Sequence, residues 1–189
     1  VPGAMMSMLN ISCINEAINE RKYTNPAQIL NHARNRIIES LSQDGSLEGG
    51  KDGMDCSLVI FDFKNKKLNY ASANNPVWIV RKTENGHELI DLKSDRMPVG
   101  KHERDNVPFN EQTIDLQVGD VVYTLTDGFA DQFGGAKGKK FKYKPLQDFL
   151  IKHVEEGMND QRQKLETAFE NWRGNLEQVD DVCIIGVKI

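Results

Sequence analysis

The strongest constraint on the fold comes from two short apolar runs, residues 56–63 (CSLVIFDF) and residues 121–126 (VVYTLT). Both are rich in β-branched and aromatic residues and are shorter than ordinary helices, so they predict buried strands. The first run is nearly continuous in hydrophobicity, which is typical of a central strand covered on both faces. Such strands require layers of other elements around them.

Helical and hairpin patterns surround these two runs. Residues recur at steps of three and four near the start of the chain, and they predict one buried helix face made of Met5, Met8, Leu9, Ser12 or Cys13, and Ile14. The expected helices are residues 4–18, a segment that begins at Asn25-Pro26, residues 143–155 and residues 160–172. The other expected strands are residues 68–73, 77–81, 88–92, 113–116 and 182–189. This order predicts one α+β domain over residues 1–189 with mainly antiparallel sheet.

The remaining segments predict turns and loops. Residues 42–54 and 134–142 are rich in glycine and charge, residues 93–110 predict an extended connection, and Gly119-Asp120 predicts a tight turn. The lysines of residues 134–142 fit either a solvated loop or a contact with a phosphorylated, acidic partner.

Composition narrows the class of function. The formal net charge is −4, from 24 basic and 28 acidic side chains, which gives no general attraction to nucleic acid or to an anionic membrane. No stretch approaches the roughly 18 apolar residues of a membrane span. The cysteines Cys13, Cys56 and Cys183 are odd in number and lack CxxC spacing, so we expect reduced, buried thiols in a cytoplasmic protein.

Acidic residues flank two of the expected strands. Asp127 directly follows one apolar strand and precedes Gly128, and Asp180 and Asp181 directly precede another. If these strands are antiparallel neighbours, the carboxylates lie at one edge of the sheet, where they repel each other unless a cation sits between them. Oxygen ligands suit hard ions such as Mg²⁺ or Mn²⁺. Taken singly, each of these residues also fits an ordinary turn or surface position.

Six segments carry a more specific resemblance: VPGAMMSML, DGMDCSLVIFD, YASANNPVWIVR, DRMPVG, GDVVYTLTDGFADQFGG and QVDDVCIIGV. In this order they resemble the motifs of the metal-dependent protein phosphatase superfamily, in its bacterial stage II sporulation E-type branch. The resemblance implies a fold like that of protein phosphatase 2C, an α-β-β-α sandwich of antiparallel sheets between helical layers. It also implies hydrolysis of phosphoserine or phosphothreonine on partner proteins.

The resemblance also implies roles for particular residues. Asp127 and Asp180 would be metal ligands, with Asp181 as an adjacent candidate. Positions near the site would be Asp55 (with Asp52 before it), Asn74, Asn75 and Gly128. For Asp55 a charged flexible loop is the alternative, and for Asn74 and Asn75 a turn at the end of a strand.

The implied mechanism uses no nucleophilic side chain. Two Mn²⁺ or Mg²⁺ ions would activate a water that attacks the phosphoester of a phosphorylated protein, in the output domain of a bacterial signalling protein. Cys56 lacks the phosphate-cradling loop of a cysteine phosphatase, and the four histidines lack metal-binding spacing. The alternative function is a non-catalytic, phosphatase-like module that docks a partner.

The start of the chain departs from the family pattern. Members carry an Asp-Gly pair directly before the VPGA segment, and that aspartate bridges two metals, whereas this sequence begins at Val1. We therefore expect a truncated domain that lacks its first strands and one metal ligand and is weakly active or inactive. An unpaired sheet edge would then allow a dimer.

Overall fold

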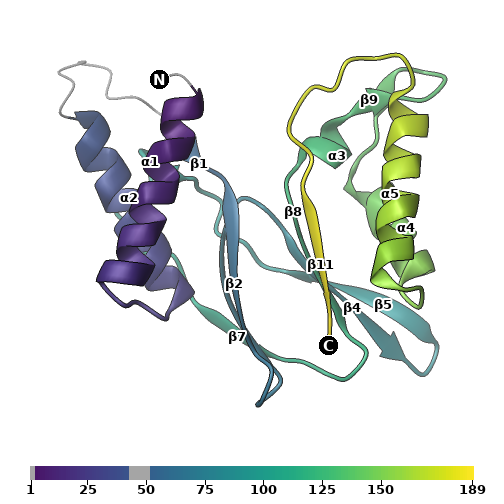
Figure 1. Ribbon diagram of the computed structural model, residues 1–189, viewed down its shortest axis with the longest axis horizontal. Coiled ribbons are helices and arrows are strands. Elements are labelled where there is room, and N and C mark those ends of the chain that lie inside the picture. Colours follow the sequence, from purple (N-terminus) through teal and green to yellow (C-terminus); the bar gives the residue numbers. More distant parts are fainter. Residues whose placement is uncertain (1–2, 43–51) are drawn as a thin grey trace. The chain divides into compact units, whose positions relative to one another are not determined.

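The computed structural model describes residues 3–42 and 52–189. The chain divides into two compact units: unit 1 is Val1–Asn75 with Lys93–Leu116, and unit 2 is Pro76–Leu92 with Gln117–Ile189. Each unit has an antiparallel sheet and helices that pack on it (Figure 1). The predicted α+β class is therefore confirmed, and the single domain over residues 1–189 stays a prediction.

Unit 1 combines helices with a three-stranded sheet. Its helical elements are α1 (Gly3–Asn15), the π-helical turn η1 (Glu16–Glu20) and α2 (Pro26–Ser42). Its strands are β1 (Gly53–Met54), β2 (Cys56–Asp62), β3 (Lys67–Ala73), β6 (Val99–Gly100) and β7 (Gln112–Asp115). The sheet has the antiparallel order β2-β3-β7, and β1 pairs separately with β6.

Helix α2 is the main cover of the unit 1 core. It begins as predicted, because the Asn25 side-chain oxygen accepts a hydrogen bond from the N–H of Gln28 at 2.9 Å and Pro26 is the first helical residue. The buried core residues come from both helices and from the strands and connection beneath them: Met6, Cys13, Ala27, Leu30, Ala33, Ile37, Ala71, Ala73, Met97, Val99 and Phe109. Burial of these side chains joins α1 and α2 to the sheet.

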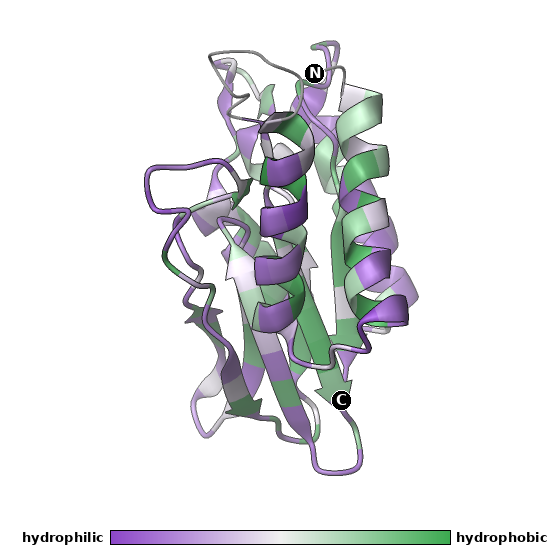
Figure 2. Cartoon of the chain, turned by 90° about the vertical axis from the view of Figure 1, so that its left-hand side faces the viewer, coloured by the Kyte–Doolittle hydropathy of each residue, from purple (hydrophilic) through white to green (hydrophobic). Residues whose placement is uncertain are grey.

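The buried face of α1 differs from the prediction. Met6 and Cys13 are its buried residues, whereas Met5 is 61% exposed and Met8 is 72% exposed. Helix α1 carries apolar residues on all sides (GAMMSMLNISCIN), so spacing alone could not select the face that packs. The prediction that Met5 and Met8 are buried is therefore wrong. Figure 2 colours the chain by hydropathy and shows bands of both kinds along the helices.

The position of β2 also differs from the prediction of a central strand. Within the described residues β2 pairs only with β3, so β3 is the central strand and β2 lies at an edge. Every residue of β2 is partly buried, in keeping with its continuous hydrophobicity. A run of apolar residues thus indicates how far the side chains of a strand are buried. It does not indicate how many strands pair with it, because that depends on other segments. Of the predicted loop 42–54, residues 43–51 lie outside the described residues.

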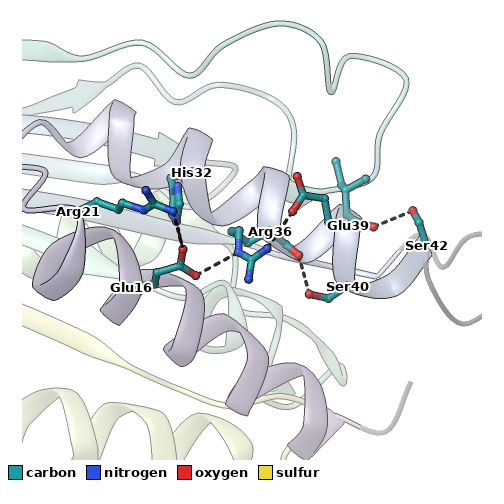
Figure 3. A network of polar contacts seen from close by, with 8 residues as sticks. Glu16, Arg21, His32, Arg36, Glu39, Ser40 and Ser42 are labelled. Atoms are coloured by element: carbon teal, nitrogen blue, oxygen red, sulfur yellow. Dashed lines mark hydrogen bonds and ion pairs between the residues drawn. The ribbon is translucent and has the colours of Figure 1, made fainter.

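A polar network joins the two helical segments of unit 1 (Figure 3). Glu16, in η1, accepts a hydrogen bond from Arg36 of α2 at 3.1 Å and lies 3.7 Å from a guanidinium nitrogen of Arg21. The His32 ring nitrogen lies 3.2 Å from the same carboxylate. The hydrogen bond from Arg36 lowers the pKa of the Glu16 carboxyl below its ordinary value. These contacts tie the end of the first helical segment to α2.

Unit 2 contains a four-stranded sheet and three helices. Its strands are β4 (Val77–Thr83), β5 (Gly86–Leu92), β8 (Val121–Leu125), β9 (Phe133–Gly134), β10 (Lys139–Lys140) and β11 (Ile184–Lys188). Its helices are α3 (Gly128–Asp131), α4 (Tyr143–His153) and α5 (Met158–Arg173). The sheet has the antiparallel order β11-β8-β4-β5, and β9 and β10 form a separate hairpin.

Strand β8 is buried as predicted and is anchored at its start by an ion pair. Asp120 is 1% exposed and accepts two hydrogen bonds from the Arg81 guanidinium, at 3.0 and 2.7 Å. The Asp120 N–H donates to the Gln117 carbonyl, and Gly119 has a φ of +93°, which confirms the predicted tight turn. A bidentate pair of this kind fixes the geometry of both strands. The opposite end of β8 leads to Asp127.

The cysteines occupy three different environments. Cys13 is buried, Cys56 is half-buried and Cys183 is exposed, so the prediction of three buried thiols is wrong for Cys183. None of the helices in residues 3–42 and 52–189 has the length and apolar character needed to cross a membrane.

Candidate functional site

The end of β8 and the start of β11 meet at one edge of the unit 2 sheet. The two strands pair antiparallel with Leu125 opposite Ile184, as the sequence predicted (Figure 1). Beyond this pair, the Thr126 hydroxyl donates to the Asp181 carbonyl at 2.9 Å and accepts from the N–H of Cys183 at 3.0 Å. The Thr126 N–H donates to the Cys183 carbonyl at 3.0 Å. The segments that carry Asp127 and Asp181 are therefore hydrogen-bonded to each other.

Gly128 lets these two segments approach closely. A Cβ atom at this position would lie 2.4 Å from the carbonyl oxygen of Asp181 and 3.3 Å from a methyl carbon of Val182. Gly128 is buried and is the first residue of α3. Any larger residue would force the backbone after Asp127 away from the backbone at Asp181. The glycine is thus a structural requirement of the junction.

Asp127 lies at the N-terminus of α3 and is exposed to solvent. Its backbone carbonyl accepts a hydrogen bond from the N–H of Asp131 at 2.9 Å, which closes the single turn of this helix. Its own backbone is in the right-handed helical region, and within the described chain its carboxylate makes no capping hydrogen bond to α3. Asp127 therefore differs from an ordinary capping aspartate, whose backbone is extended and whose carboxylate binds the helix.

Asp180 and Asp181 lie on the segment that approaches β11, and both are exposed. The Asp181 N–H donates to a carboxylate oxygen of Asp180 at 2.7 Å, and the Gln178 side chain donates to the Asp180 carbonyl at 2.8 Å. These bonds hold the two aspartates in a defined turn directly before the junction with Thr126. A position in a turn is therefore compatible with a role of Asp180 and Asp181 in a metal site.

Gln132 positions this segment, although the sequence analysis did not single it out. The side chain is fully buried, donates to the Glu177 carbonyl at 2.9 Å and accepts from the Val179 N–H at 3.3 Å. Its backbone carbonyl accepts the indole N–H of Trp172 at 3.0 Å. Gln132 thus connects α3 to the residues just before Asp180. A lone glutamine among apolar residues gives little signal in a sequence, because its partners are distant along the chain.

Asp55, Asn74 and Asn75 come together in unit 1, at the turn that follows β3. The Asn74 side chain donates to an Asp55 carboxylate oxygen at 2.8 Å, and Asn74 has a φ of +60°. The Asn75 carbonyl accepts from the hydroxyls of Ser57 and Ser72. These contacts show that Asn74 and Asn75 form a turn at the end of a strand, which was one of the two interpretations of these residues. The near-site role of the three residues stays a prediction.

The acidic side chains of unit 2 are of the chemical kind that binds a divalent cation, but too few of them are arranged around one point. Asp127, Asp180 and Asp181 provide carboxylate oxygens, which are the ligands that Mg²⁺ and Mn²⁺ prefer. In residues 3–42 and 52–189, however, no group of three or more His, Cys, Asp or Glu side chains is arranged to hold a metal ion. The assignment of these aspartates as metal ligands stays a prediction.

Cys56 is unsuited to nucleophilic catalysis. Burial raises the pKa of its thiol to about 12, with a smaller contribution from the negative charge of Asp55. The thiolate is the nucleophilic form of cysteine, so this thiol is protonated and unreactive near neutral pH.

Comparison with known proteins identifies a family for the chain. The sequence profile of the family described as stage II sporulation protein E (SpoIIE) matches residues 1–189. A comparison with curated proteins returns no match.

Three solved structures share the fold. The SiaA-PP2C domain of Pseudomonas aeruginosa is 27% identical with a TM-score of 0.85, over 100% of this chain and 71% of that one. The structure of the RsbU and RsbW domains of Rv1364c from Mycobacterium tuberculosis is 16% identical with a TM-score of 0.70, over 98% of this chain and 47% of that one. The catalytic domain of the serine threonine protein phosphatase PstP, in complex with 2 manganese ions, is 13% identical with a TM-score of 0.62, over 97% of this chain and 80% of that one. The predicted PP2C-like fold is thereby confirmed.

Proposed function

Since this chain belongs to the stage II sporulation protein E (SpoIIE) family and has the fold of PP2C-type serine/threonine phosphatases, we propose that it removes phosphate from phosphoserine and phosphothreonine on a partner protein. The reaction depends on two divalent ions, Mn²⁺ or Mg²⁺. The observation that carries the proposal is the junction in which Thr126 and Gly128 hold the Asp127 segment against Asp181.

The residues of unit 2 have distinct roles in this proposal. Asp127 and Asp180 hold the metal, and Asp181 is the adjacent candidate. When bound, the ions lower the pKa of a water molecule and offset charge on the phosphoryl oxygens. Thr126 and Gly128 position the two acidic segments, and Gln132 positions the approach to Asp180. These supports are hydrogen bonds to backbone groups and one close backbone approach, so they fix the course of the two segments that carry the carboxylates.

One observation on a relative and one on this chain support the use of divalent ions. The solved catalytic domain of PstP contains 2 manganese ions. Its fold is shared by this chain, and the aspartates at the unit 2 edge are the oxygen ligands such ions require. We place the reaction in a cytoplasmic bacterial signalling protein, with this domain as its output. The chain spans 71% of the SiaA-PP2C chain and 47% of the Rv1364c chain, so the activity of a whole protein is part of the proposal.

The test is phosphate release by a version of the chain that is extended upstream of Val1 to include an Asp-Gly pair before VPGA. We expect Mn²⁺-dependent hydrolysis of a phosphoserine protein, with loss of activity on chelation and recovery when Mn²⁺ is restored. The measurement is inorganic phosphate released per chain over time. Activity that persists unchanged in excess chelator would contradict metal-dependent hydrolysis.

The alternative function, a docking module without turnover, gives a different result in the same experiment. A partner would bind in a fixed ratio, and phosphate would stay on it whether or not Mn²⁺ is present. The family membership and the exposed position of Asp127 favour the enzyme.

For the 189-residue chain alone we propose weak metal binding and little activity. Its described residues hold no group of three or more ligands arranged around one point. We expect Mn²⁺ to bind with a dissociation constant on the order of 10⁻⁴ M or weaker, in the range of sites with few charged ligands. Calorimetric titration measures this, with the Asp127→Asn/Asp180→Asn variant as the blank. Tight binding of two Mn²⁺ per chain would show that the ligand set is already sufficient.

A further inference from the structure

A lysine-rich hairpin follows α3 directly in unit 2. We call residues 133–144 the lysine hairpin; β9 and β10 pair within it, with Gly134 opposite Lys139 and Phe133 opposite Lys140. Its sequence, FGGAKGKKFKYK, contains no acidic residue. Its exposed lysines are Lys137, Lys139, Lys140, Lys142 and Lys144. The net charge of the whole chain is −4, so this is a local concentration of positive charge on an acidic protein.

Only some of these lysines are neutralised by the protein itself. Lys140 lies 2.8 Å from a carboxylate oxygen of Asp131, and Lys144 lies 2.9 Å from one of Asp148. Across residues 3–42 and 52–189, Lys137, Lys139 and Lys142 form no ion pair. Three uncompensated like charges on a short hairpin repel one another, and an anionic partner would relieve this repulsion.

The backbone at Lys142 is strained. Its φ is +75° and its ψ is 158°, a region that is populated almost only by glycine. Its N–H donates to the Ala130 carbonyl at 2.7 Å, which holds the residue in this conformation. Backbone strain of this kind is concentrated at functional positions, where the role of the side chain outweighs the loss of folding stability. A lysine therefore occupies a position at which glycine would be more stable.

The hairpin is held beside the proposed reaction site. The Phe141 N–H donates to the Gln132 carbonyl at 3.0 Å, and Lys140 pairs with Asp131, the last residue of α3. Asp131 in turn donates its N–H to the carbonyl of Asp127, one helical turn away. On the other side, the Gly135 N–H donates to the Trp172 carbonyl at 2.8 Å. A chain of contacts thus runs from the hairpin to Asp127 within unit 2.

We propose that the lysine hairpin binds an acidic stretch beside the phosphorylated residue of the protein substrate. This inference rests on the proposed phosphatase function and adds a class of substrate to it. Lys137, Lys139 and Lys142 supply the charges, and the contacts with α3 connect the hairpin to the segment that carries Asp127. A protein segment is favoured over nucleic acid because the acidic remainder of the chain repels a long polyanion.

Affinity tests the hairpin independently of catalysis. The probes are two fluorescent phosphoserine peptides, one with acidic and one with neutral flanking residues, and a single-stranded oligonucleotide. The variant K137Q/K139Q/K142Q is compared with K82Q/K152Q/K188Q, which removes the same charge from exposed positions of unit 2 outside the hairpin. We expect the hairpin variant to bind the acidic phosphopeptide about tenfold more weakly, from the loss of three exposed charge contacts. The control variant should change this affinity by less than about twofold.

The proposal would be overturned if the hairpin variant and the control variant bound the acidic phosphopeptide with equal affinity. It would also be overturned if the hairpin variant lost as much affinity for the neutral phosphopeptide as for the acidic one. The third contrary result is a tightly bound oligonucleotide whose affinity falls by the same factor as that of the acidic phosphopeptide. The variant Lys142→Gly separates binding from stability, since it should raise the melting temperature while it weakens binding of the acidic peptide. In the version extended upstream of Val1, if it hydrolyses phosphoesters, the hairpin variant should lower kcat/KM for the acidic phosphopeptide and leave hydrolysis of p-nitrophenyl phosphate unchanged. If no chain hydrolyses either substrate, the proposed phosphatase function fails, and the affinities still decide the role of the hairpin.

Discussion

Replacement of Asp127 by asparagine is expected to lower Mn²⁺-dependent phosphate release by at least about 100-fold in a chain long enough to be active. The substitution keeps the shape of the side chain and removes the negative charge that a divalent ion needs. The fold should be retained, because the contact that closes α3 is made by the Asp127 backbone carbonyl and not by the carboxylate. The measurements are kcat/KM at saturating Mn²⁺ and the Mn²⁺ concentration that gives half-maximal activity.

The matched control is Asp131→Asn, at the other end of the same helical turn. Asp131 pairs with Lys140 at the surface, and its loss should change hydrolysis of p-nitrophenyl phosphate by less than about twofold, as for other exposed ion pairs. Similar losses in both variants would indicate a general effect on α3. Full activity in Asp127→Asn would remove this residue from the metal site.

The approach of the Asp127 segment to the Asp181 segment at one sheet edge could be anticipated from sequence because it depends on local patterns. The ends of the apolar runs mark the ends of β8 and β11, and antiparallel pairing then brings the flanking residues together. The Asn85-Gly86 pair between β4 and β5 is a turn signal of the same local kind, and Gly86 has a φ of +121°, which few residues other than glycine adopt. Local steric rules decide both features.

Features that depend on distant segments could not be predicted. Gln132 bonds to Glu177 and Val179, which are 45 and 47 residues away, and nothing near Gln132 in the sequence marks it as buried. The edge position of β2 depends on which strands pair with it, and the four-residue helix α3 is too short to have a helical period. Helix α1 has apolar residues on every side, so packing against other elements decides which face is buried. These features are decided by tertiary contacts.

Replacement of Gly128 by alanine is expected to lower the free energy of unfolding by about 2–4 kcal/mol. The new Cβ would lie 2.4 Å from the Asp181 carbonyl oxygen and 3.0 Å from its carbonyl carbon. Both are backbone atoms held by the Thr126 hydrogen bonds, so a side-chain rotation cannot relieve the clash. For a chain of this size the melting temperature should fall by roughly 8 °C, measured by circular dichroism.

Gly3→Ala is the matched control, because Gly3 also begins a helix and a Cβ there would meet no atom within 4 Å. It should leave the melting temperature unchanged or slightly higher, since alanine favours helix more than glycine does. The two effects of Gly128→Ala can be separated by an activity assay well below its melting temperature. There, the folded variant should still release phosphate at least about tenfold more slowly, because a shift at Asp181 changes the geometry of the acidic residues on both sides of the junction. A variant that is as stable and as active as Gly3→Ala would show that the close approach of the two segments is not required.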